Sequence, residues 1–282
     1  MFRKPRVSVG VIGLGIIGSR VAAHLRTAGY NVPVWNRTPK TEPNFLGSPA
    51  QVARAATVIQ LFVADGAAVF EVIDAMGDAL TPEHTVICNA TIGLEATLEA
   101  AKRVRERGAK FLDAPFTGSK EAAEKAQLLY YIGGDDATLE AVRPVLEASG
   151  GKGIIKIGSI GQAAVIKVAT NVLSAATVEV LSEMVSLVKA AGVAPEVLST
   201  ALERHGIRSG ITDMKLPKMI AGEFEPHFAL KHMLKDVRLG LDLATELKLD
   251  LPVTKITELA MQEGMERGWA DLDFSTLIQR YS

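Results

Sequence analysis

Lys167 is the only charged residue between Ile157 and Val178, in a stretch whose composition otherwise predicts a buried helix. Asn171 and Ser174 follow at intervals of four and three residues, so the three polar side chains share one face of that helix. Desolvation disfavours the charged form of a lysine, and a neighbouring amide can orient a small polar molecule. The pattern therefore indicates a proton-transfer site. The alternative is a lysine whose stem lies on apolar surface while its ammonium reaches water at a domain junction.

A glycine-rich motif near the N-terminus predicts a dinucleotide site. The apolar run Val7–Ile12 leads into GLGIIG, and an amphipathic helical pattern follows over Ile16–Ala28. In this setting the first glycine permits a tight turn, the second lets the backbone approach a pyrophosphate, and the third lets helix and strand pack closely. The helix start adds N–H donors and the positive end of the helix dipole. The motif residues are Gly13, Leu14, Gly15, Ile16, Ile17 and Gly18.

Asn36, Arg37 and Thr38 end the second predicted strand. An NAD-selective site usually places a carboxylate here, against the ribose 2′-hydroxyl. A guanidinium suits a 2′-phosphate, which a carboxylate would repel. We therefore expect NADP to be preferred over NAD, with an ordinary surface arginine as the alternative.

A second loop is expected to line the same cofactor cleft, because it also follows a strand. It contains Val63 and Ala64, at the end of the predicted strand Thr57–Val63. Asp65 comes next and is expected to cap the helix that follows.

Thr117, Gly118 and Ser119 lie in the segment DAPFTGS, between a predicted strand that ends at Asp113 and the helical pattern AAEKA. Hydroxyls and backbone N–H groups at a helix start form a natural binding place for a carboxylate. The same residue types are common turn formers, so a plain turn is the alternative.

The elements that must position these residues divide the chain in two. Before Gly161, short β-rich runs alternate with helical patterns, which predicts βαβ units and a mostly parallel sheet. After Gly161 the strand pattern disappears and helical spacing replaces it. We expect an α/β fold class, with a Rossmann-type doubly wound NADP-binding domain over residues 1–160 and an all-α substrate and oligomerisation domain over 161–282. The predicted strands are Val7–Ile12, Val32–Trp35, Thr57–Val63, Thr85–Asn89, Phe111–Asp113 and Leu128–Gly133. The predicted helices are Ile16–Ala28, Ala67–Met76, Glu95–Glu106, one from Gly161 to about Ala191, one opening at Pro195, one over Leu230–Leu247, one opening at Pro252, and a short one around Ser275–Gln279.

Composition argues against several classes of protein. The formal net charge is −1 and basic residues are scattered, which argues against nucleic acid or an anionic membrane as a partner. The single cysteine, Cys88, cannot form a disulfide framework, and the five histidines show no metal-ligand spacing, so no metal is expected. The N-terminal apolar run is short and punctuated by glycine, which favours a strand over a signal peptide. Polar residues around Lys167 argue against a transmembrane span, so we expect a cytoplasmic protein.

Four motifs occur in order over essentially the whole chain: GLGIIG with NRT, DAPFTGS, GSIGQAAVIKVATN and FALKHMLKD. This set resembles the β-hydroxyacid dehydrogenases, the family that includes 3-hydroxyisobutyrate dehydrogenase, tartronate semialdehyde reductase and the glyoxylate/succinic semialdehyde reductases. Some positions depart from the family pattern. Thr117 and Phe116 replace the commoner serine and valine, Ser119 stands where glycine is frequent, and Asn89 replaces a usual aspartate. These departures weaken the assignment of any one named substrate.

The resemblance implies a role for each matching residue. Lys167 would be the general acid in carbonyl reduction and the base in the reverse direction, and Asn171 would position the substrate. Thr117, Gly118 and Ser119 would hold the substrate carboxylate.

Two further cofactor contacts follow from the resemblance alone. Thr91 would contact the cofactor, and Lys235 would approach its nicotinamide end. From the pattern, Lys235 belongs to a solvated stripe with Lys231, Arg238 and Asp242.

We therefore expect an NADP(H)-dependent oxidoreductase that interconverts a small aldehyde or keto acid bearing a carboxylate with its hydroxyacid. The compact, apolar helical domain and the resemblance imply a homodimer or homotetramer. An imine reductase shares the architecture but typically lacks a lysine at the position of Lys167. A noncatalytic NADP-binding sensor or scaffold is the alternative from another class, although a pure binder needs neither Lys167 nor Asn171.

Overall fold

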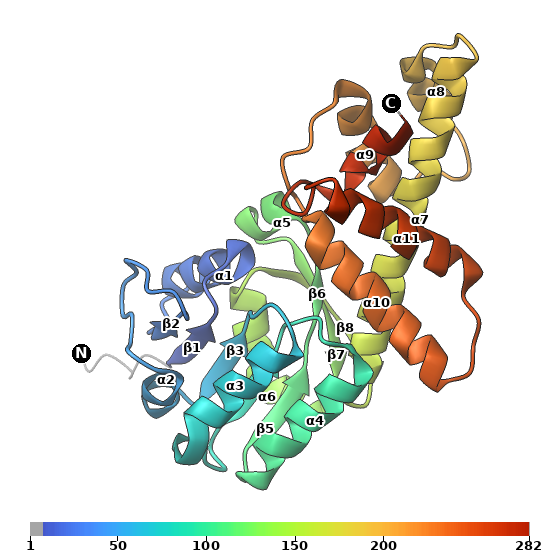
Figure 1. Cartoon of the computed structure of the whole chain (residues 1–282). Coiled ribbons are helices and arrows are strands. Elements are labelled where there is room, and N and C mark those ends of the chain that lie inside the picture. Colours follow the sequence, from blue (N-terminus) through green and yellow to red (C-terminus); the bar gives the residue numbers. More distant parts are fainter. Residues whose placement is uncertain (1–7, 282) are drawn as a thin grey trace. The chain divides into compact units, whose positions relative to one another are not determined.

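The computed structural model describes residues 8–281, so residues 1–7 and 282 lie outside the described part, and with them the start of the first predicted strand. Two compact units divide the chain, Met1–Lys167 and Val168–Ser282. The division falls inside the helix α7, Gln162–Ala190. Figure 1 shows the first unit as a sheet flanked by helices and the second as helices alone.

The first unit alternates strands and helices along the chain, as predicted. Its strands are β1 Val9–Ile12, β2 Val34–Trp35, β3 Val58–Leu61, β4 Thr85–Cys88, β5 Lys110–Asp113, β6 Phe116–Thr117, β7 Leu128–Gly133 and β8 Gly151–Gly158. Its helices are α1 Ile16–Thr27, α2 Pro49–Ala55, α3 Gly66–Met76, α4 Gly93–Glu106, α5 Lys120–Glu124 and α6 Asp136–Ala148, with a 3-10 turn, η1, over Gly77–Ala79.

Within residues 8–281 the strands form one eight-stranded sheet in the order β2-β1-β3-β4-β5-β7-β6, with β8 beside β7. Pairing is parallel from β2 to β5, β7 is antiparallel to β5 and β6, and β8 is parallel to β7. The chain leaves β1 in one direction to form β2 and returns past it to form β3. The order therefore reverses between β1 and β3, and open α/β sheets bind ligands at such a switch point.

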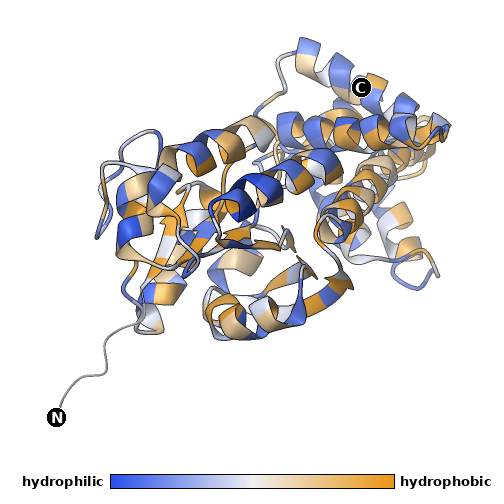
Figure 2. Ribbon diagram, turned by 90° about the horizontal axis from the view of Figure 1, so that it is seen from below, coloured by the Kyte–Doolittle hydropathy of each residue, from blue (hydrophilic) through white to orange (hydrophobic). Residues whose placement is uncertain are grey.

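Helices cover both faces of this sheet, because its central strands are apolar on both sides. One core packs the sheet against α1, α5 and α6, with Val9, Val11 and Leu112 facing it. The other packs against α2, α3 and α4, with Ile12 and Phe111 facing it. In Figure 2 the flanking helices carry hydrophilic residues along one side and hydrophobic residues along the other. The doubly wound α/β class is confirmed.

All six predicted strands are present, and their ends within the described residues differ from the prediction by at most two residues. The strands β6 and β8 and the helices α2, α6 and α9 were not predicted. β8 has the sequence GKGIIKIG and pairs only with β7, so it lacks the continuous apolar run of a central strand. β6 is two residues long and lies among turn-forming residues. Neither strand has a periodic pattern that sequence could reveal.

The described residues of the second unit form helices joined by loops, as predicted, with one isolated β-bridge between Ala229 and Asp273. After α7 come α8 Pro195–Leu202, α9 Gly210–Ala221, α10 Leu230–Glu246, α11 Pro252–Glu266 and the 3-10 helix η2 Phe274–Tyr281. Their shared core includes Val178, Met219, Val237 and Met261.

A buried ion pair fixes where α10 begins. Lys215 Nζ donates to both carboxylate oxygens of Asp273, at 2.7 and 2.8 Å, and both side chains are almost fully buried. Asp273 also accepts the backbone N–H groups of His227 and Phe228, just ahead of α10. These bonds satisfy a carboxylate that would otherwise be costly to bury, and they tie three segments together.

Helix α7 is apolar on two opposite sides. Ala175, Val178 and other residues pack into the core of the second unit. On the opposite side Leu173, Val180 and Leu187 recur every seven residues and are 69%, 50% and 59% exposed. Such a repeat is typical of a helix that packs along another helix.

Of the helices in residues 8–281, α7 is also the one long and apolar enough to cross a membrane by length and composition.

Candidate active site

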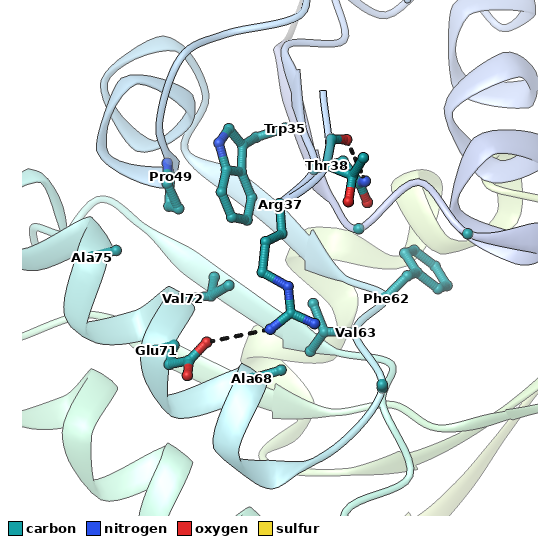
Figure 3. Close-up of a pocket in the computed structure, with 14 residues that line it drawn as sticks. Trp35, Arg37, Thr38, Pro49, Phe62, Val63, Ala68, Glu71, Val72 and Ala75 are labelled. Carbon is teal, nitrogen blue, oxygen red and sulfur yellow. Dashed lines mark hydrogen bonds and ion pairs between the residues drawn. The ribbon is translucent and has the colours of Figure 1, made fainter. Parts of the chain in front are cut away.

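A pocket of about 380 Å³ lies in the first unit at the point where the strand order reverses. The loops after β1 and β3 meet there, and α3 forms one wall (Figure 3). Its lining residues are Gly13, Gly15, Trp35, Asn36, Arg37, Thr38, Pro49, Phe62, Val63, Ala64, Ala68, Glu71, Val72 and Ala75. Seven of them were predicted to bind the cofactor: Gly13, Gly15, Asn36, Arg37, Thr38, Val63 and Ala64.

The three glycines of GLGIIG differ in the space around them. Gly13 has φ +95°, and a Cβ there would lie 2.1 Å from the carbonyl oxygen of Phe62. A Cβ on Gly18 would lie 2.0 Å from the carbonyl oxygen of Gly13. Gly15 has no atom within 4 Å of its Cβ position, so its backbone is open to close approach. Helix α1 begins directly after Gly15 with no side-chain cap, which leaves its first turn suited to a pyrophosphate.

Asn36 is tied to the glycine-rich loop. Its Oδ1 accepts the backbone N–H of Leu14 at 2.9 Å, and its Nδ2 donates to the carbonyl oxygen of Thr38 at 2.7 Å. Lys40 Nζ donates to the carbonyl oxygen of Leu14 at 2.6 Å. Asn36 and Lys40 therefore hold the loop from the end of β2, and the role of Lys40 was missed by sequence reasoning. A cation so close to Arg37 in the sequence was the available signal.

Arg37 and Thr38 present a cation and a hydroxyl at the rim of the pocket. Arg37 is strongly exposed, and its guanidinium lies 3.9 Å from the carboxylate of Glu71 on α3. Figure 3 shows the Arg37 side chain extending past Val63 and Ala68 towards Glu71.

The remaining predicted cofactor residues do not line this pocket. Leu14 and Gly18 are buried, and both backbone polar groups of Leu14 are bonded to Asn36 and Lys40. Ile17 packs against the core beneath the loop, and the side chain of Ile16 is half exposed. Thr91 lies between β4 and α4, at the edge of the sheet where the strands β1 and β3 also end. Its cofactor contact stays a prediction.

These features fit a dinucleotide. The open backbone at Gly15 and the uncapped start of α1 suit a pyrophosphate, and the wall of Trp35, Ala68 and Val72 suits an adenine ring. Asp65 caps α3 as predicted, accepting the N–H of Ala68 at 2.9 Å, so the β3–α3 loop is held in place at the pocket.

The start of α7 is bonded to the end of β5. Asp113 Oδ2 accepts the backbone N–H groups of Gly161 and Ala164, both at 3.0 Å. Asp113 is 1% exposed, and its burial raises the pKa of the carboxyl group from 3.8 to about 7, since the two N–H groups offset the desolvation only in part. This long-range cap fixes the residue at which α7 begins. It therefore also fixes the position of Lys167, which lies in the second turn of that helix. Sequence reasoning placed Asp113 only at the end of a strand.

Lys167 and Asn171 lie one turn apart on α7, as the spacing predicts. In the second unit, Asn171 Nδ2 donates to Oδ2 of Asp236 at 2.6 Å. Asp236 is 1% exposed, and its other oxygen lies 2.7 Å from Lys235 Nζ. A carboxylate accepts only from the NH₂ side of an amide, so Asp236 fixes which way the Asn171 amide points. The structure thus brings Asn171 and Lys235 together through one buried carboxylate.

Thr117 ends β6, and Gly118 and Ser119 lead from it into α5, with Ser119 as the N-cap of that helix. Gly118 has φ +141°, and a Cβ there would lie 2.9 Å from Leu128. Ser119 accepts the N–H of Ala122 and donates its hydroxyl to Glu121 Oε2 at 2.7 Å. Local bonds thus account for the Ser119 hydroxyl, and binding of a substrate carboxylate by this turn stays a prediction.

Comparison with protein families gives two matches that together cover almost the whole chain. Residues 8–161 match the NAD-binding domain of 6-phosphogluconate dehydrogenase. Residues 161–281 match the domain described as the NAD-binding domain of NADP-dependent 3-hydroxyisobutyrate dehydrogenase.

Curated relatives match over nearly the full chain. Glyoxylate/succinic semialdehyde reductase 2 of Arabidopsis thaliana is 29% identical, over 97% of this chain and 79% of its own length. The 2-hydroxy-3-oxopropionate reductase of Escherichia coli is 31% identical, over 97% of this chain and 96% of its own. The cytokine-like nuclear factor N-PAC of Mus musculus is 25% identical, and the match covers half of its length.

Solved structures show the same fold. The 3-hydroxyisobutyrate dehydrogenase of Mycobacterium tuberculosis, solved with L-serine, superposes with a TM-score of 0.89 at 24% identity, over 98% of this chain and 99% of the other. Psf3, solved with NADP⁺ and 2-OPP, has a TM-score of 0.85 at 20% identity, over 97% and 100%. An imine reductase of Streptomyces aurantiacus has a TM-score of 0.65 at 21% identity, over 98% and 99%.

We expect Asp113→Asn to reduce the pH dependence of stability. Because burial raises the pKa of Asp113 in the folded protein, the folded state holds a proton that the unfolded chain releases between about pH 4 and pH 7. The contribution of this group to stability is therefore lost as the pH rises through that window. An asparagine keeps one oxygen for both N–H groups of α7 and does not titrate.

Urea unfolding at pH 5 and pH 8 measures the effect. Relative to the wild type, Asp113→Asn should lose less stability between the two pH values, while Asp78→Asn, at an exposed position, should behave like the wild type. An unchanged pH dependence in Asp113→Asn would show that other groups cause it.

Proposed function

The chain belongs to the β-hydroxyacid dehydrogenase family, and on that premise we propose that it transfers hydride reversibly between NADP(H) and a small aldehyde or keto acid that carries a carboxylate. The protein is an NAD(P)-dependent oxidoreductase acting on CH–OH groups. The preference for NADP, the lysine mechanism and the substrate class are what we propose.

The mechanism assigns proton transfer to Lys167. The bound nicotinamide cofactor supplies the hydride for reduction and accepts it in the reverse direction. Lys167 donates a proton to the carbonyl oxygen of the substrate as that carbon is reduced, and takes it back during oxidation. The arrangement of α7 supports this role most directly, because Asp113 anchors the start of the helix and Asn171 follows Lys167 by one turn.

Substrate orientation is assigned to Asn171 and to the turn Thr117–Ser119. Asp236 holds the Asn171 amide in one orientation and pairs with Lys235, so the amide is preorganised before a substrate arrives. The names of the relatives, glyoxylate/succinic semialdehyde reductase and 2-hydroxy-3-oxopropionate reductase, favour small substrates with a carboxylate.

The preference for NADP rests on Arg37 and Thr38. Both line the pocket where the ribose of the adenosine half would lie, and Arg37 supplies the positive charge that a 2′-phosphate requires. One structural neighbour was solved with NADP⁺.

A second copy of the chain is the partner we propose, in a homodimer or homotetramer. The apolar stripe Leu173, Val180 and Leu187 on α7 is exposed over about four turns. Val253, Ile256 and Leu259 form a similar stripe on α11. Exposed apolar area of this extent is typical of an interface.

We propose the cytoplasm as the location. Burial raises the pKa of the Cys88 thiol to about 12, so the single cysteine is an unreactive core residue that needs no oxidising compartment. Cell fractionation followed by immunoblotting checks this.

Lys167→Ala should lower kcat for aldehyde reduction by a factor of about 10²–10⁴, the usual contribution of a general acid, and should leave cofactor binding nearly unchanged. The measurement is a panel of glyoxylate, succinic semialdehyde, tartronate semialdehyde and 3-hydroxyisobutyrate with both cofactors. Lys189→Ala, at the exposed end of α7, is the matched control. Full activity of Lys167→Ala would refute the proton-transfer role.

The same panel with a cyclic imine added separates the alternative functions. Preferred turnover of a cyclic imine over every carboxylate would indicate an imine reductase. Binding of NADPH without turnover of any substrate would indicate a noncatalytic sensor or scaffold. One relative, N-PAC, is named as a nuclear factor and not as an enzyme.

Arg37→Ala should raise the KM for NADPH about tenfold or more and change the KM for NADH less than about threefold, because a charge-assisted contact to the 2′-phosphate is lost. Arg54→Ala removes an exposed arginine of the same unit that does not line the pocket. Equal changes for the two cofactors would contradict the proposed preference.

Val180→Glu combined with Leu187→Glu should convert the oligomer to monomer, because two carboxylates would be buried in the interface. Size-exclusion chromatography with light scattering gives the mass, and Thr200→Glu, at an exposed polar position, should leave it unchanged. An unaltered mass would place the interface elsewhere.

A further inference from the structure

Glu71 is the only acidic residue among the fourteen that line the pocket, and Arg37 is the only basic one. Their charged groups lie 3.9 Å apart, and both side chains are mostly exposed, at 69% and 79%. In Figure 3 a dashed line joins the Arg37 guanidinium to the Glu71 carboxylate. Opposite charges thus face each other where sequence reasoning placed a single cation.

Glu71 lies on the side of α3 that faces away from the hydrophobic core. Val69, Val72 and Ile73 are buried under the helix, whereas Glu71 projects from its pocket side. Replacement of Glu71 by glutamine therefore changes charge without disturbing packing. The exposed ion pair itself contributes little to stability.

The ion pair between Arg37 and Glu71 affects how a 2′-phosphate can bind, an inference that rests on the proposed contact between Arg37 and that phosphate. With the side chains placed as they are, a phosphate bound to Arg37 lies close to the Glu71 carboxylate, because the guanidinium and that carboxylate are 3.9 Å apart. The phosphate carries nearly two negative charges at neutral pH, so the carboxylate repels it and also occupies the guanidinium that it needs. A ribose 2′-hydroxyl carries no charge and meets neither effect.

We propose that Glu71 is a specificity-determining residue that competes with the 2′-phosphate of NADP(H) for Arg37. It weakens the binding of NADP(H) and leaves the binding of NAD(H) nearly unaffected. Glu71 therefore reduces the preference for NADP(H) over NAD(H) that Arg37 provides.

The test compares adenosine 2′,5′-bisphosphate with 5′-AMP, which differ only in the 2′-phosphate. Binding is followed by the fluorescence of Trp35, which lines the pocket, and checked by calorimetry. Glu71→Gln should tighten the bisphosphate about threefold to tenfold and change 5′-AMP less than about twofold, as expected for one exposed carboxylate near a multiply charged ligand. The gain should shrink between about 0.05 and 0.5 M salt, because screening weakens repulsion between exposed charges.

Controls separate this proposal from a general charge effect. Asp78→Asn removes the same charge from an exposed position just after α3, outside the pocket, and should not change either affinity. In the background of Arg37→Ala, Glu71→Gln should give a smaller gain, because the competition for the guanidinium is gone and only direct repulsion remains.

Two results would overturn the proposal while leaving the NADP preference intact. Wild type could bind the bisphosphate through Arg37 with Glu71→Gln changing its affinity less than twofold, or Asp78→Asn could give an equal gain. The proposed NADP preference fails separately, if wild type binds the two nucleotides equally and Arg37→Ala changes neither.

Discussion

The buried carboxylate of Asp113 is the interaction on which the candidate active site depends. It lies at the end of β5 and accepts the N–H groups of Gly161 and Ala164, so the last central parallel strand is bonded directly to the first turn of α7. An N-terminal cap normally comes from a neighbouring residue, whereas this one comes from 48 residues earlier in the chain. Lys167 can hold one position only if the helix starts at one position, and Asp113 provides that constraint.

The cofactor half of the site depends on a second constraint, the close approach of backbone segments at the switch point. Gly13 and Gly18 have no room for a side chain, and Asn36 and Lys40 bond the loop between them to the end of β2. A rigid loop keeps the backbone of Gly15 open. Catalysis by hydride transfer requires little chemistry from the protein beyond this positioning, one proton donor and a shaped pocket.

In the second unit, too, buried carboxylates hold polar groups and helix ends in place. Asp236 is buried, and it orients the Asn171 amide while pairing with Lys235. Asp273 likewise holds the start of α10, the helix that carries Asp236, by accepting two backbone N–H groups and the Lys215 ammonium. In each case a buried acid is stabilised by a hydrogen-bond donor and a cation, and its removal would leave those groups without their partner.

The sequence by itself determined the class of fold, the location of the dinucleotide loop and the polar face of α7. These features are local: GLGIIG, the NRT segment and the four-residue interval from Lys167 to Asn171 each express their geometry within a single strand–turn–helix unit or helix. Only the tertiary structure decided that Asp113 caps α7, that Asp236 orients Asn171, and that Glu71 faces Arg37 across the pocket. Those pairs are separated by 34 to 65 residues and belong to different elements, so their distance depends on how strands order and helices pack. No pattern of spacing along one chain contains that information.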